Sequence, residues 1–397
     1  MKVLLVNKFL YPKGGAETYV LRMGEQLEKM GHEVQYFGMY DEKNTVGNRA
    51  NAYTPNFDFH TSSWKKIFYP FQIVYSSKAR KQIRKVIEDF KPDVVHMNNI
   101  HFQLTPSIIY EVKAHNIPIV YTAHDYQVIC PNHMLYVPQQ NRVCEDCLDG
   151  KYSCCSKNSC IHESKIKSII GTFESKIYHR KHTYELFDKV ICPSQFMEDK
   201  LQSDKEFHGK TCTIHNFIEE IEKKDVEKND YVLYFGRFSV EKGFGTLLTV
   251  CKELPEIDFV FAGSGPLEEM LNGIDNVKNV GFKTGEELEN LIREARFSIY
   301  ASEWYENCPF SVMESEMYGT PVIGANMGGI PELIQDGKTG LLFERANVDD
   351  LREKVMILWN NQELLDQMTK NCQNITFDTN KEYCEKIEKI YEEVISR

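Results

Sequence analysis

The chain has 397 residues, of which 42% are hydrophobic and 26% are charged, a composition typical of a globular protein with two or three domains. Its formal net charge of −11 disfavours a general role in binding nucleic acid, so we expect no nucleic-acid partner. No apolar run approaches the roughly 20 residues of a membrane-spanning helix, and KVLLV at the start is too short for a signal peptide, so we expect a cytoplasmic protein.

Strand-like and helix-like segments alternate through the first half of the chain. KVLLVN at 2–7 predicts a buried strand, and GGAETYVLRMGEQLEKMG at 14–31 predicts a helix with one apolar side that ends at Gly31. Further strands are predicted at 32–38, 91–97, 117–125, 188–194 and 212–217.

The pattern restarts after a charged segment, IEEIEKKDVEKND at 218–230, which predicts a linker. Strands are then predicted at 231–238, 258–265, 278–282, 297–302 and 321–326. Two such runs predict an α/β protein with two doubly wound domains, at 1–217 and 231–379, followed by a long charged helix at 380–397. We expect the ligand site at the carboxyl ends of the strands, in a cleft between the domains.

One stretch, YENCPFSVMESEMYGTPVIGANMGGIPELI at 305–334, places the acids Glu306 and Glu314 beside a proline and two glycine turns. Ser311 and Glu314 match the S-x-x-E capping box, which predicts a short helix from near Ser311 with an anion site at its start. In one interpretation Glu314 caps this helix and Glu306 is a solvated acid. In the other, both carboxylates bind ligand hydroxyl groups.

Cations and glycines accompany the predicted strand ends and helix starts. Arg237 ends one strand and Lys242 follows five residues later. Glycines occur in the same kind of position: Gly14, Gly15, Gly263, Gly265, Gly328 and Gly329. This combination suits a diphosphate, although a surface ion pair with Glu241 explains Arg237 and Lys242 equally well.

Several nucleotide motifs are missing. No two aspartates lie two positions apart, so the chain lacks the Asp-x-Asp motif of metal-dependent sugar-nucleotide sites. Arg237, Lys242 and the helix dipole then have to neutralise a leaving diphosphate, and we expect no cofactor for catalysis. The chain also lacks a P-loop, and GSGPLE lacks the third glycine of a dinucleotide fingerprint.

Taken together, these motifs resemble those of the retaining GT-B glycosyltransferases of family 4. The resemblance rests on Glu306-x7-Glu314 with GTPVIGANMGGIPELI and KTGLLF, and on GGAE, TAHD, GRFSVEKG and FAGSGP, so it covers nearly the whole chain. It implies two Rossmann-like domains, metal-independent sugar transfer with retention of configuration, and a final helix that crosses back to the first domain. The expected donor is a UDP- or GDP-sugar.

The resemblance also implies roles for individual residues. Arg237 and Lys242 bind the diphosphate, Glu306 the sugar hydroxyls and Glu314 the ribose. His124, in TAHD, lies beside the transferred sugar, although a core histidine at a strand end is the alternative. The remaining expected donor-binding positions are Gly14, Gly15, Gly263, Phe310, Ser311 and Val312. The family has no settled protein nucleophile, and we assign none.

A cysteine-rich insertion after His124 departs from the simple family pattern. Its Cys144-x2-Cys147 knuckle is followed by further cysteines, which predicts a structural zinc site drawn from Cys144, Cys147, Cys154, Cys155 and Cys160. An iron–sulfur cluster and unliganded thiols are the alternatives.

A local basic patch offers the one indication of the acceptor. From Phe59 to Ile87 there is no acid, but there are seven basic residues, and aromatic residues interleave with the first of them: Trp64, Lys65, Lys66, Phe68, Tyr69, Phe71, Lys78, Arg80, Lys81, Arg84 and Lys85. One interpretation is a solvated helix face. The other is peripheral binding to the inner, anionic face of the cell membrane and to a lipid-linked or saccharide acceptor.

Two other functional classes remain open at this stage. A sugar-nucleotide epimerase or a phosphorylase has the same fold; release of free UDP from the donor indicates a transferase, and a bound pyridoxal cofactor a phosphorylase. A metal-binding interaction protein with a decayed sugar site is a different class, which the intact Arg237, Lys242, Glu306 and Glu314 disfavour.

Overall fold

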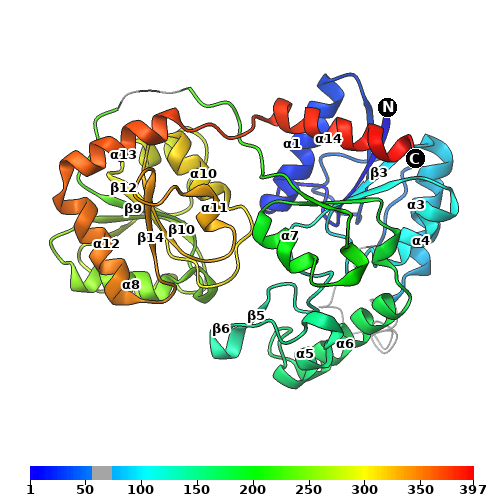
Figure 1. Cartoon of the computed structure of the whole chain (residues 1–397), viewed down its shortest axis with the longest axis horizontal. Helices are drawn as coiled ribbons and strands as arrows, with labels where there is room; N and C mark the ends of the chain where they lie inside the picture. The colour runs from blue at the N-terminus through cyan, green and yellow to red at the C-terminus, as the bar shows by residue number, and fades with distance from the viewer. Residues whose placement is uncertain (56–73, 223, 225) are drawn as a thin grey trace. The chain divides into compact units, whose positions relative to one another are not determined.

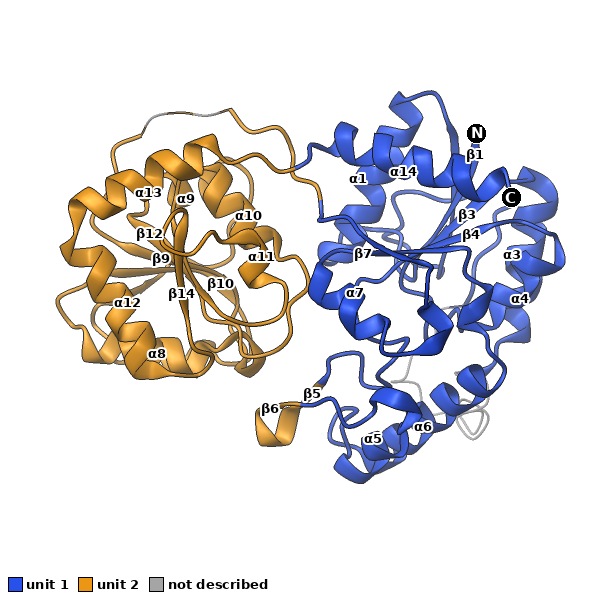
Figure 2. Ribbon diagram, viewed as in Figure 1, with its two compact units in different colours: residues 1–135, 144–216, 378–397 blue, residues 136–143, 217–377 orange. Residues whose placement is uncertain are grey.

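The computed structural model describes residues 1–55, 74–222, 224 and 226–397, which form two compact units (Figure 2). Unit 1 comprises residues 1–135, 144–216 and 378–397, and unit 2 comprises residues 136–143 and 217–377. Each contains a six-stranded parallel sheet with helices on its faces, so the predicted pair of Rossmann-like domains is confirmed (Figure 1). Among the described residues, no helix is long and apolar enough to cross a membrane.

Unit 1 has the strand order β2-β1-β3-β4-β7-β8. Its strands are β1 (Lys2–Val6), β2 (Glu33–Phe37), β3 (Val94–Met97), β4 (Ile119–Thr122), β7 (Lys189–Cys192) and β8 (Thr211–Thr213). Its helices are α1 (Gly15–Lys29), α3 (Ser77–Phe90), α4 (Ser107–Ala114), α5 (Ser153–Asn158), α6 (Lys165–Arg180), α7 (Gln195–Leu201) and α14 (Asn380–Ile395). β1, β3 and β4 are almost entirely buried, which explains their continuous apolar runs.

Helix α14 follows unit 2 in the chain but packs against α1 in unit 1 (Figure 2). It begins with a complete capping box, in which Thr379 and Glu382 each satisfy the other's backbone N–H. Its buried residues recur every three or four positions and form one face: Tyr383, Cys384, Ile387, Ile390, Tyr391 and Val394. The charged residues lie on the opposite face, so the segment that reads as charged in sequence is an amphipathic helix.

Unit 2 has the strand order β11-β10-β9-β12-β13-β14. Its strands are β9 (Val232–Arg237), β10 (Phe259–Ser264), β11 (Val277–Asn279), β12 (Phe297–Tyr300), β13 (Val322–Ala325) and β14 (Gly340–Phe343). Its helices are α8 (Phe244–Glu253), α9 (Glu286–Glu294), α10 (Phe310–Met317), α11 (Ile330–Leu333), α12 (Val348–Asn360) and α13 (Gln362–Asn374). One large apolar cluster joins β9, β10, β12 and β13 to α8, α12 and α13.

Residues 136–143 differ from the predicted division, because they leave the insertion of unit 1 and group with unit 2. They form a small hairpin of β5 (Tyr136–Val137) and β6 (Arg142–Val143). At its turn, the Asn141 side chain donates to Glu303 Oε2 at 2.7 Å, and Arg345 Nη2 donates to the Asn141 carbonyl at 2.9 Å. These polar contacts account for a grouping that the apolar pattern of the sequence does not indicate.

Candidate functional site

The predicted donor-binding residues of unit 2 gather at the carboxyl ends of neighbouring parallel strands. Arg237 ends β9, Gly263 lies near the end of β10, and Glu306 lies in the loop after β12. The chain runs from β9 outward to β10 and β11, whereas β12, β13 and β14 lie on the other side of β9. The strand order therefore reverses between β9 and β12, the kind of position at which α/β sheets bind ligands.

Lys242 and Glu306 meet beside this reversal. Lys242 Nζ lies 2.5 Å from Glu306 Oε1 and 3.1 Å from Tyr300 Oη. Ser302 Oγ and Trp304 Nε1 also donate to Glu306 Oε1, at 2.7 and 2.6 Å. Three donors thus converge on one carboxylate oxygen, whereas no residue in the described part of the chain donates to Oε2.

The pair is largely shielded from water, since the side chains of Lys242 and Glu306 are 22% and 10% exposed. Burial acts to raise the pKa of Glu306, but the Lys242 charge and the donors from Trp304 and Ser302 outweigh it and hold the pKa below its ordinary value. Burial likewise acts to lower the pKa of Lys242, and Glu306 and Tyr300 raise it above its ordinary value. Both groups are therefore charged at neutral pH.

The surface ion pair with Glu241 that the sequence left open is wrong for Lys242. Glu241 accepts a hydrogen bond from Ser239 Oγ at 2.6 Å, and Lys242 turns instead to Glu306. Arg237 is exposed, and no ion pair joins its guanidinium to any residue that the structure describes. It is thus a cation at the end of β9 that remains available to a ligand.

The predicted capping box at the start of α10 is also wrong. The helix begins one residue earlier than predicted, with Phe310, and its N-cap is Pro309, which has no side-chain donor or acceptor. Ser311 and Glu314 therefore lie inside the helix, where they cannot form an N-cap and N3 pair. This removes helix capping as the explanation of Glu314, which is half-buried one turn into α10. Phe310 and Ser311 are half-buried and Val312 is buried.

Two of the predicted glycines have packing reasons for being glycine. Gly328 has φ +59°, and a Cβ there would lie 2.3 Å from the Glu306 carbonyl oxygen, to which Gly329 N–H donates at 2.7 Å. This glycine turn therefore holds the backbone of Glu306. At Gly263 a Cβ would lie 1.9 Å from the Gly236 carbonyl oxygen, so close pairing of β10 with β9 already requires glycine.

In unit 1, Gly14 and Gly15 open α1, where Gly14 is the N-cap and has no side chain to offer. His124 follows β4, and its Nε2 lies 2.8 Å from Asn98 Oδ1, in the loop after β3. Because the amide oxygen can only accept, Nε2 carries the proton. Burial lowers the pKa of His124 to about 3, so the ring is neutral at physiological pH.

A buried polar network lies next to His124. The Tyr19 ring meets the His124 ring edge to face at 4.8 Å, and Tyr19 Oη lies 2.6 Å from Tyr383 Oη and 3.2 Å from Thr122 Oγ1. His96 continues the network with Thr122 at 2.7 Å, and its Nδ1 lies 2.6 Å from the hydroxyl of Tyr391 on α14. Helix α14 is thus hydrogen-bonded to the strands that carry the candidate site of unit 1.

The cysteines of the insertion gather in a buried region of unit 1. Cys130, Cys144, Cys147, Cys155 and Cys160 are all buried and Cys154 is half-buried, and none forms a disulfide. In the described part of the chain, however, the one set of three potential ligand atoms within 4.8 Å of one another is His179, Asp204 and Glu206. No three thiols approach one another that closely, so the zinc site remains a prediction.

The basic patch proves to be partly structural. Arg80 and Arg84 on α3 bind the buried Glu111 on α4, with nitrogen–oxygen distances of 2.9 and 2.6 Å. These two arginines therefore hold Glu111 in place, although Arg84 itself stays exposed as a solvated helix face predicts. The lysines of the helix, Lys78, Lys81 and Lys85, are exposed. Trp64, Lys65, Lys66, Phe68, Tyr69 and Phe71 lie outside the described residues.

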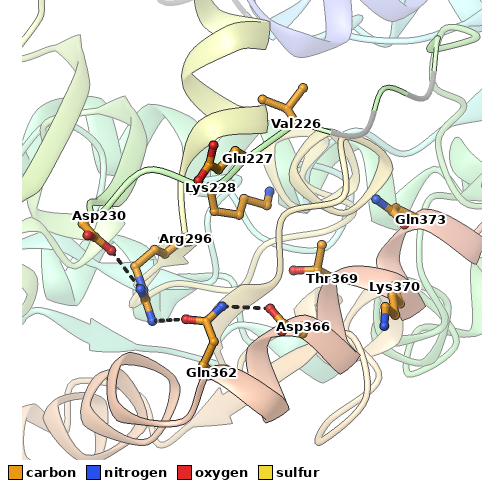
Figure 3. A pocket seen from close by; sticks show the side chains of 10 residues that line it. All are labelled: Val226, Glu227, Lys228, Asp230, Arg296, Gln362, Asp366, Thr369, Lys370 and Gln373. Carbon is orange, nitrogen blue, oxygen red and sulfur yellow. Dashed lines mark hydrogen bonds and ion pairs between the residues drawn. The ribbon is translucent and has the colours of Figure 1, made fainter.

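One hollow in unit 2 lies away from these groups. It has a volume of about 460 Å³ and lies between residues 226–230 and α13, where Asp230, Arg296, Gln362 and Asp366 form a chain of polar contacts (Figure 3). Asp230 and Arg296 precede β9 and β12, so this hollow is at the amino ends of the strands. It contains none of the predicted site residues.

Sequence reasoning missed the hydrogen-bond partners that hold the Lys242–Glu306 pair and His124. Ser302 and Trp304 lie four and two residues before Glu306, and Tyr300, which ends β12, contacts Lys242, so their nearness in sequence was an available signal. The sequence signal for Asn98 was weaker. Asn98 follows β3, His124 follows β4, and these two strands are neighbours in the sheet.

Comparisons with known proteins identify the family of the chain. The model of the family described as glycosyl transferases group 1 matches residues 216–375, and the model of Glycosyltransferase Family 4 matches residues 13–220. An uncharacterized protein from a cps region of Klebsiella pneumoniae is 25% identical over 84% of this chain and 87% of its own length. An uncharacterized glycosyltransferase of Methanocaldococcus jannaschii is 28% identical over 55% of this chain, a match that spans 63% of that relative.

Solved structures share the fold. A sucrose-phosphate synthase from Thermosynechococcus elongatus superposes with a TM-score of 0.73 at 16% identity, covering 100% of this chain and 99% of its own. Anabaena HepE in complex with UDP has a TM-score of 0.68 at 16% identity, covering 99% of this chain and 100% of its own.

The Lys242–Glu306 pair generates a stability prediction. We expect Lys242→Met to lower the free energy of unfolding of unit 2 by about 3–5 kcal/mol at pH 7, because it leaves a buried, uncompensated carboxylate. The double variant Lys242→Met/Glu306→Gln should be more stable than Lys242→Met alone. Urea unfolding followed by circular dichroism measures both.

The pH dependence provides a control. In the wild type, the lowered pKa of Glu306 gives stability that is present above the pKa of an unfolded glutamate and is lost as the pH falls through the lowered value. Without Lys242, we expect burial to raise the pKa of Glu306 instead. The difference in the free energy of unfolding between the wild type and Lys242→Met should therefore shrink toward acid pH. A difference that is constant between pH 4 and 7 would contradict the charged pair.

Proposed function

Because the chain belongs to Glycosyltransferase Family 4 and carries a group 1 glycosyltransferase domain, we propose that it transfers a sugar from a nucleotide-diphosphate sugar to a saccharide or lipid-linked acceptor. The transfer retains configuration and is metal-independent. The Klebsiella relative from a cps region supports a role in bacterial polysaccharide or glycolipid synthesis, and HepE, solved with UDP, supports a UDP-linked donor.

The observation that carries this proposal is the asymmetry of the Glu306 carboxylate. Oε1 receives three donors, while Oε2 receives none from the described residues. A charged acceptor held in a fixed position at the carboxyl ends of the strands suits a sugar hydroxyl, which donates to Oε2. The three donors keep the carboxylate from turning, so little reorganisation is needed when the sugar binds.

The diphosphate is proposed to bind beside the sugar. The Lys242 ammonium has three N–H donors, of which Glu306 and Tyr300 take two, and the third suits a phosphate oxygen. Arg237 adds an exposed guanidinium at the end of β9, with two N–H groups in the geometry that binds phosphate. Together these cations neutralise the charge that develops on the leaving diphosphate, which is the task that a metal performs in Asp-x-Asp enzymes.

The remaining roles follow the same chemistry. Glu314, one turn into α10, is proposed to accept hydrogen bonds from the ribose hydroxyls. In unit 1, His124 is neutral and its Nε2–H is taken by Asn98, so it contributes as a polar, uncharged ring beside the transferred sugar. The bare backbone at Gly14 and Gly15 suits close approach to the donor phosphate.

Donor binding gives the first test. At 100 times its dissociation constant, the correct UDP-, GDP- or ADP-sugar should stabilise the protein by about 2.7 kcal/mol in a thermal-shift screen. Glu314→Gln should weaken this donor by about 10- to 150-fold, since hydrogen bonds to charged groups contribute about 1.5–3 kcal/mol. Glu306→Gln should lower kcat more than it raises KM, because its interaction strengthens as the bond to the diphosphate breaks.

Three results would count against these assignments. The first is the lack of a thermal shift with any of the three sugar nucleotides. The second is full turnover by a well-folded Glu306→Gln variant, and the third is unchanged donor affinity in Glu314→Gln. Transfer of the sugar from a sugar 1-phosphate to a saccharide acceptor, with release of inorganic phosphate and no free UDP, would favour a phosphorylase instead.

Peripheral membrane binding is proposed to use the exposed lysines of α3. Each basic residue near an anionic surface contributes about 1 kcal/mol, so replacing Lys78, Lys81 and Lys85 with serine should weaken binding to anionic vesicles by about 3 kcal/mol at low salt. Arg80 and Arg84 are kept because they hold Glu111. Vesicle sedimentation measures the effect, with Lys252, Lys278 and Lys370 of unit 2 changed to serine as the matched control. Equal losses in both triple variants would refute a specific surface.

A structural zinc ion is proposed for the cysteine-rich insertion. Cys144, Cys147, Cys155 and Cys160 are buried and Cys154 is half-buried, and none of them forms a disulfide. The sulfurs are further apart than one ion would hold them, so zinc has to draw Cys144, Cys147 and two of Cys154, Cys155 and Cys160 together. Elemental analysis of protein purified without chelators should find about one zinc per chain. Less than a tenth of an equivalent of any transition metal per chain would refute the proposal.

A further inference from the structure

Lys8 occupies an uncommon position in unit 1. It follows β1, and the strand order of unit 1 reverses between β1 and β3, so Lys8 lies at the place where this sheet is expected to bind a ligand. The side chain is half-buried. Nevertheless, no carboxylate among the described residues lies within ion-pair distance of its ammonium, and no described group accepts a hydrogen bond from it. A shielded cation without a partner is costly, which makes it a candidate for binding an anion.

Aromatic rings surround this cation. Lys8 Nζ lies 5.0 Å from the ring centre of Phe9 and 5.2 Å from that of Phe102. Phe102 has φ +67°, a conformation that is unfavourable for a bulky residue and is retained mostly where the surrounding structure imposes it. Cation–π contacts stabilise Lys8 but leave all three N–H donors of its ammonium without an oxygen acceptor among the described residues.

A second cation shares the same ring. Lys13 Nζ lies 3.5 Å from the ring centre of Phe9, and Lys13 is exposed. Phe9 in turn meets Tyr11 edge to face at 5.7 Å. Two ammonium groups on one aromatic ring repel each other, and an anion placed between them would relieve that repulsion.

We propose that Lys8 and Lys13 bind a phosphate group of the acceptor, which is then a phosphate-linked saccharide or lipid whose sugar ring packs on Phe9 or Phe102. The identification of this ligand as the acceptor rests on the proposed glycosyltransferase function; the anion site itself does not. The same phosphate chemistry could come from the nucleotide donor, and the experiment below separates the two sources.

The charged neighbours of Lys8 determine its pH dependence. Burial, followed by Lys13, lowers the pKa of Lys8 to about 8, while Glu17 on α1 and Asp125 after β4 act to raise it. His101 and His133 also face Lys8, and burial lowers the pKa of each, so neither adds a positive charge at neutral pH. Lys8 is therefore charged below pH 8 and loses its charge as the pH rises through that value.

Isothermal titration of the full chain with inorganic pyrophosphate tests the proposal. We expect Lys8→Met to weaken pyrophosphate binding about tenfold or more, and Lys8→Arg to retain it. Between pH 7 and 9 the wild-type affinity should fall relative to that of Lys8→Arg, whose guanidinium stays charged. This comparison cancels the ionisation of pyrophosphate itself, and it needs no neutral variant to fold. Lys252→Met, an exposed lysine of unit 2, serves as the matched control.

Two further arms separate the sources of the phosphate. Arg237→Ser should weaken UDP binding but keep the pyrophosphate binding that depends on Lys8. If Lys8→Met weakens UDP binding as strongly as pyrophosphate binding, the phosphate belongs to the donor, and the acceptor site is refuted. If Lys8→Met and Lys8→Arg both match the wild type at every pH, the anion site is refuted, while UDP binding by the wild type still decides the proposed function independently.

Discussion

The buried ion pair between Lys242 and Glu306 is the interaction on which the candidate site of unit 2 depends. It joins the segment after β9 to the segment after β12, the two neighbouring strands at which the strand order reverses. The backbone N–H of Glu303 donates to the Glu241 carbonyl at 2.9 Å between these two loops, and the charged side-chain contact adds a second link that fixes their separation. Tyr300, Ser302 and Trp304 complete the arrangement, and the glycine turn at Gly328 fits against the Glu306 backbone. The same contacts that stabilise the loops therefore orient the carboxylate.

Unit 1 positions its polar side chains at the carboxyl ends of the strands with uncharged groups. Tyr19, Thr122 and His96 connect two hydroxyls of α14 to the strands beside His124. Burial lowers the pKa of His96 to about 3, so this network carries no charge that would need compensation. The two units thus position polar side chains at the carboxyl ends of their sheets by different means, one through an ion pair and the other through a chain of neutral hydrogen bonds.

Much of this organisation could be read from the sequence, because the features involved are periodic or local. Buried parallel strands are continuous apolar runs, and Arg237, Lys242 and Glu306 are close to strand ends that those runs define. The prediction of a capping box at Ser311 and Glu314 was wrong because the same four-residue pattern also occurs inside helices. The helix begins instead directly after Pro309, which is its N-cap. The shared partner of Arg80 and Arg84 could not be predicted for another reason. Glu111 is on the next helix, and no short-range sequence pattern predicts an ion pair between two helices. Asn98 and the hairpin at 136–143 depend on the same kind of long-range contact.

Helix α14 also determines the order in which the protein can fold on the ribosome. Domains generally fold as units during synthesis, the N-terminal one first. Here the tyrosines of residues 378–397 complete the interior of unit 1, yet these residues are made only after all of unit 2. Unit 2 can therefore close while unit 1 still exposes the apolar side of α1. A chain whose synthesis stops within unit 2 therefore lacks the residues that cover this hydrophobic surface of unit 1.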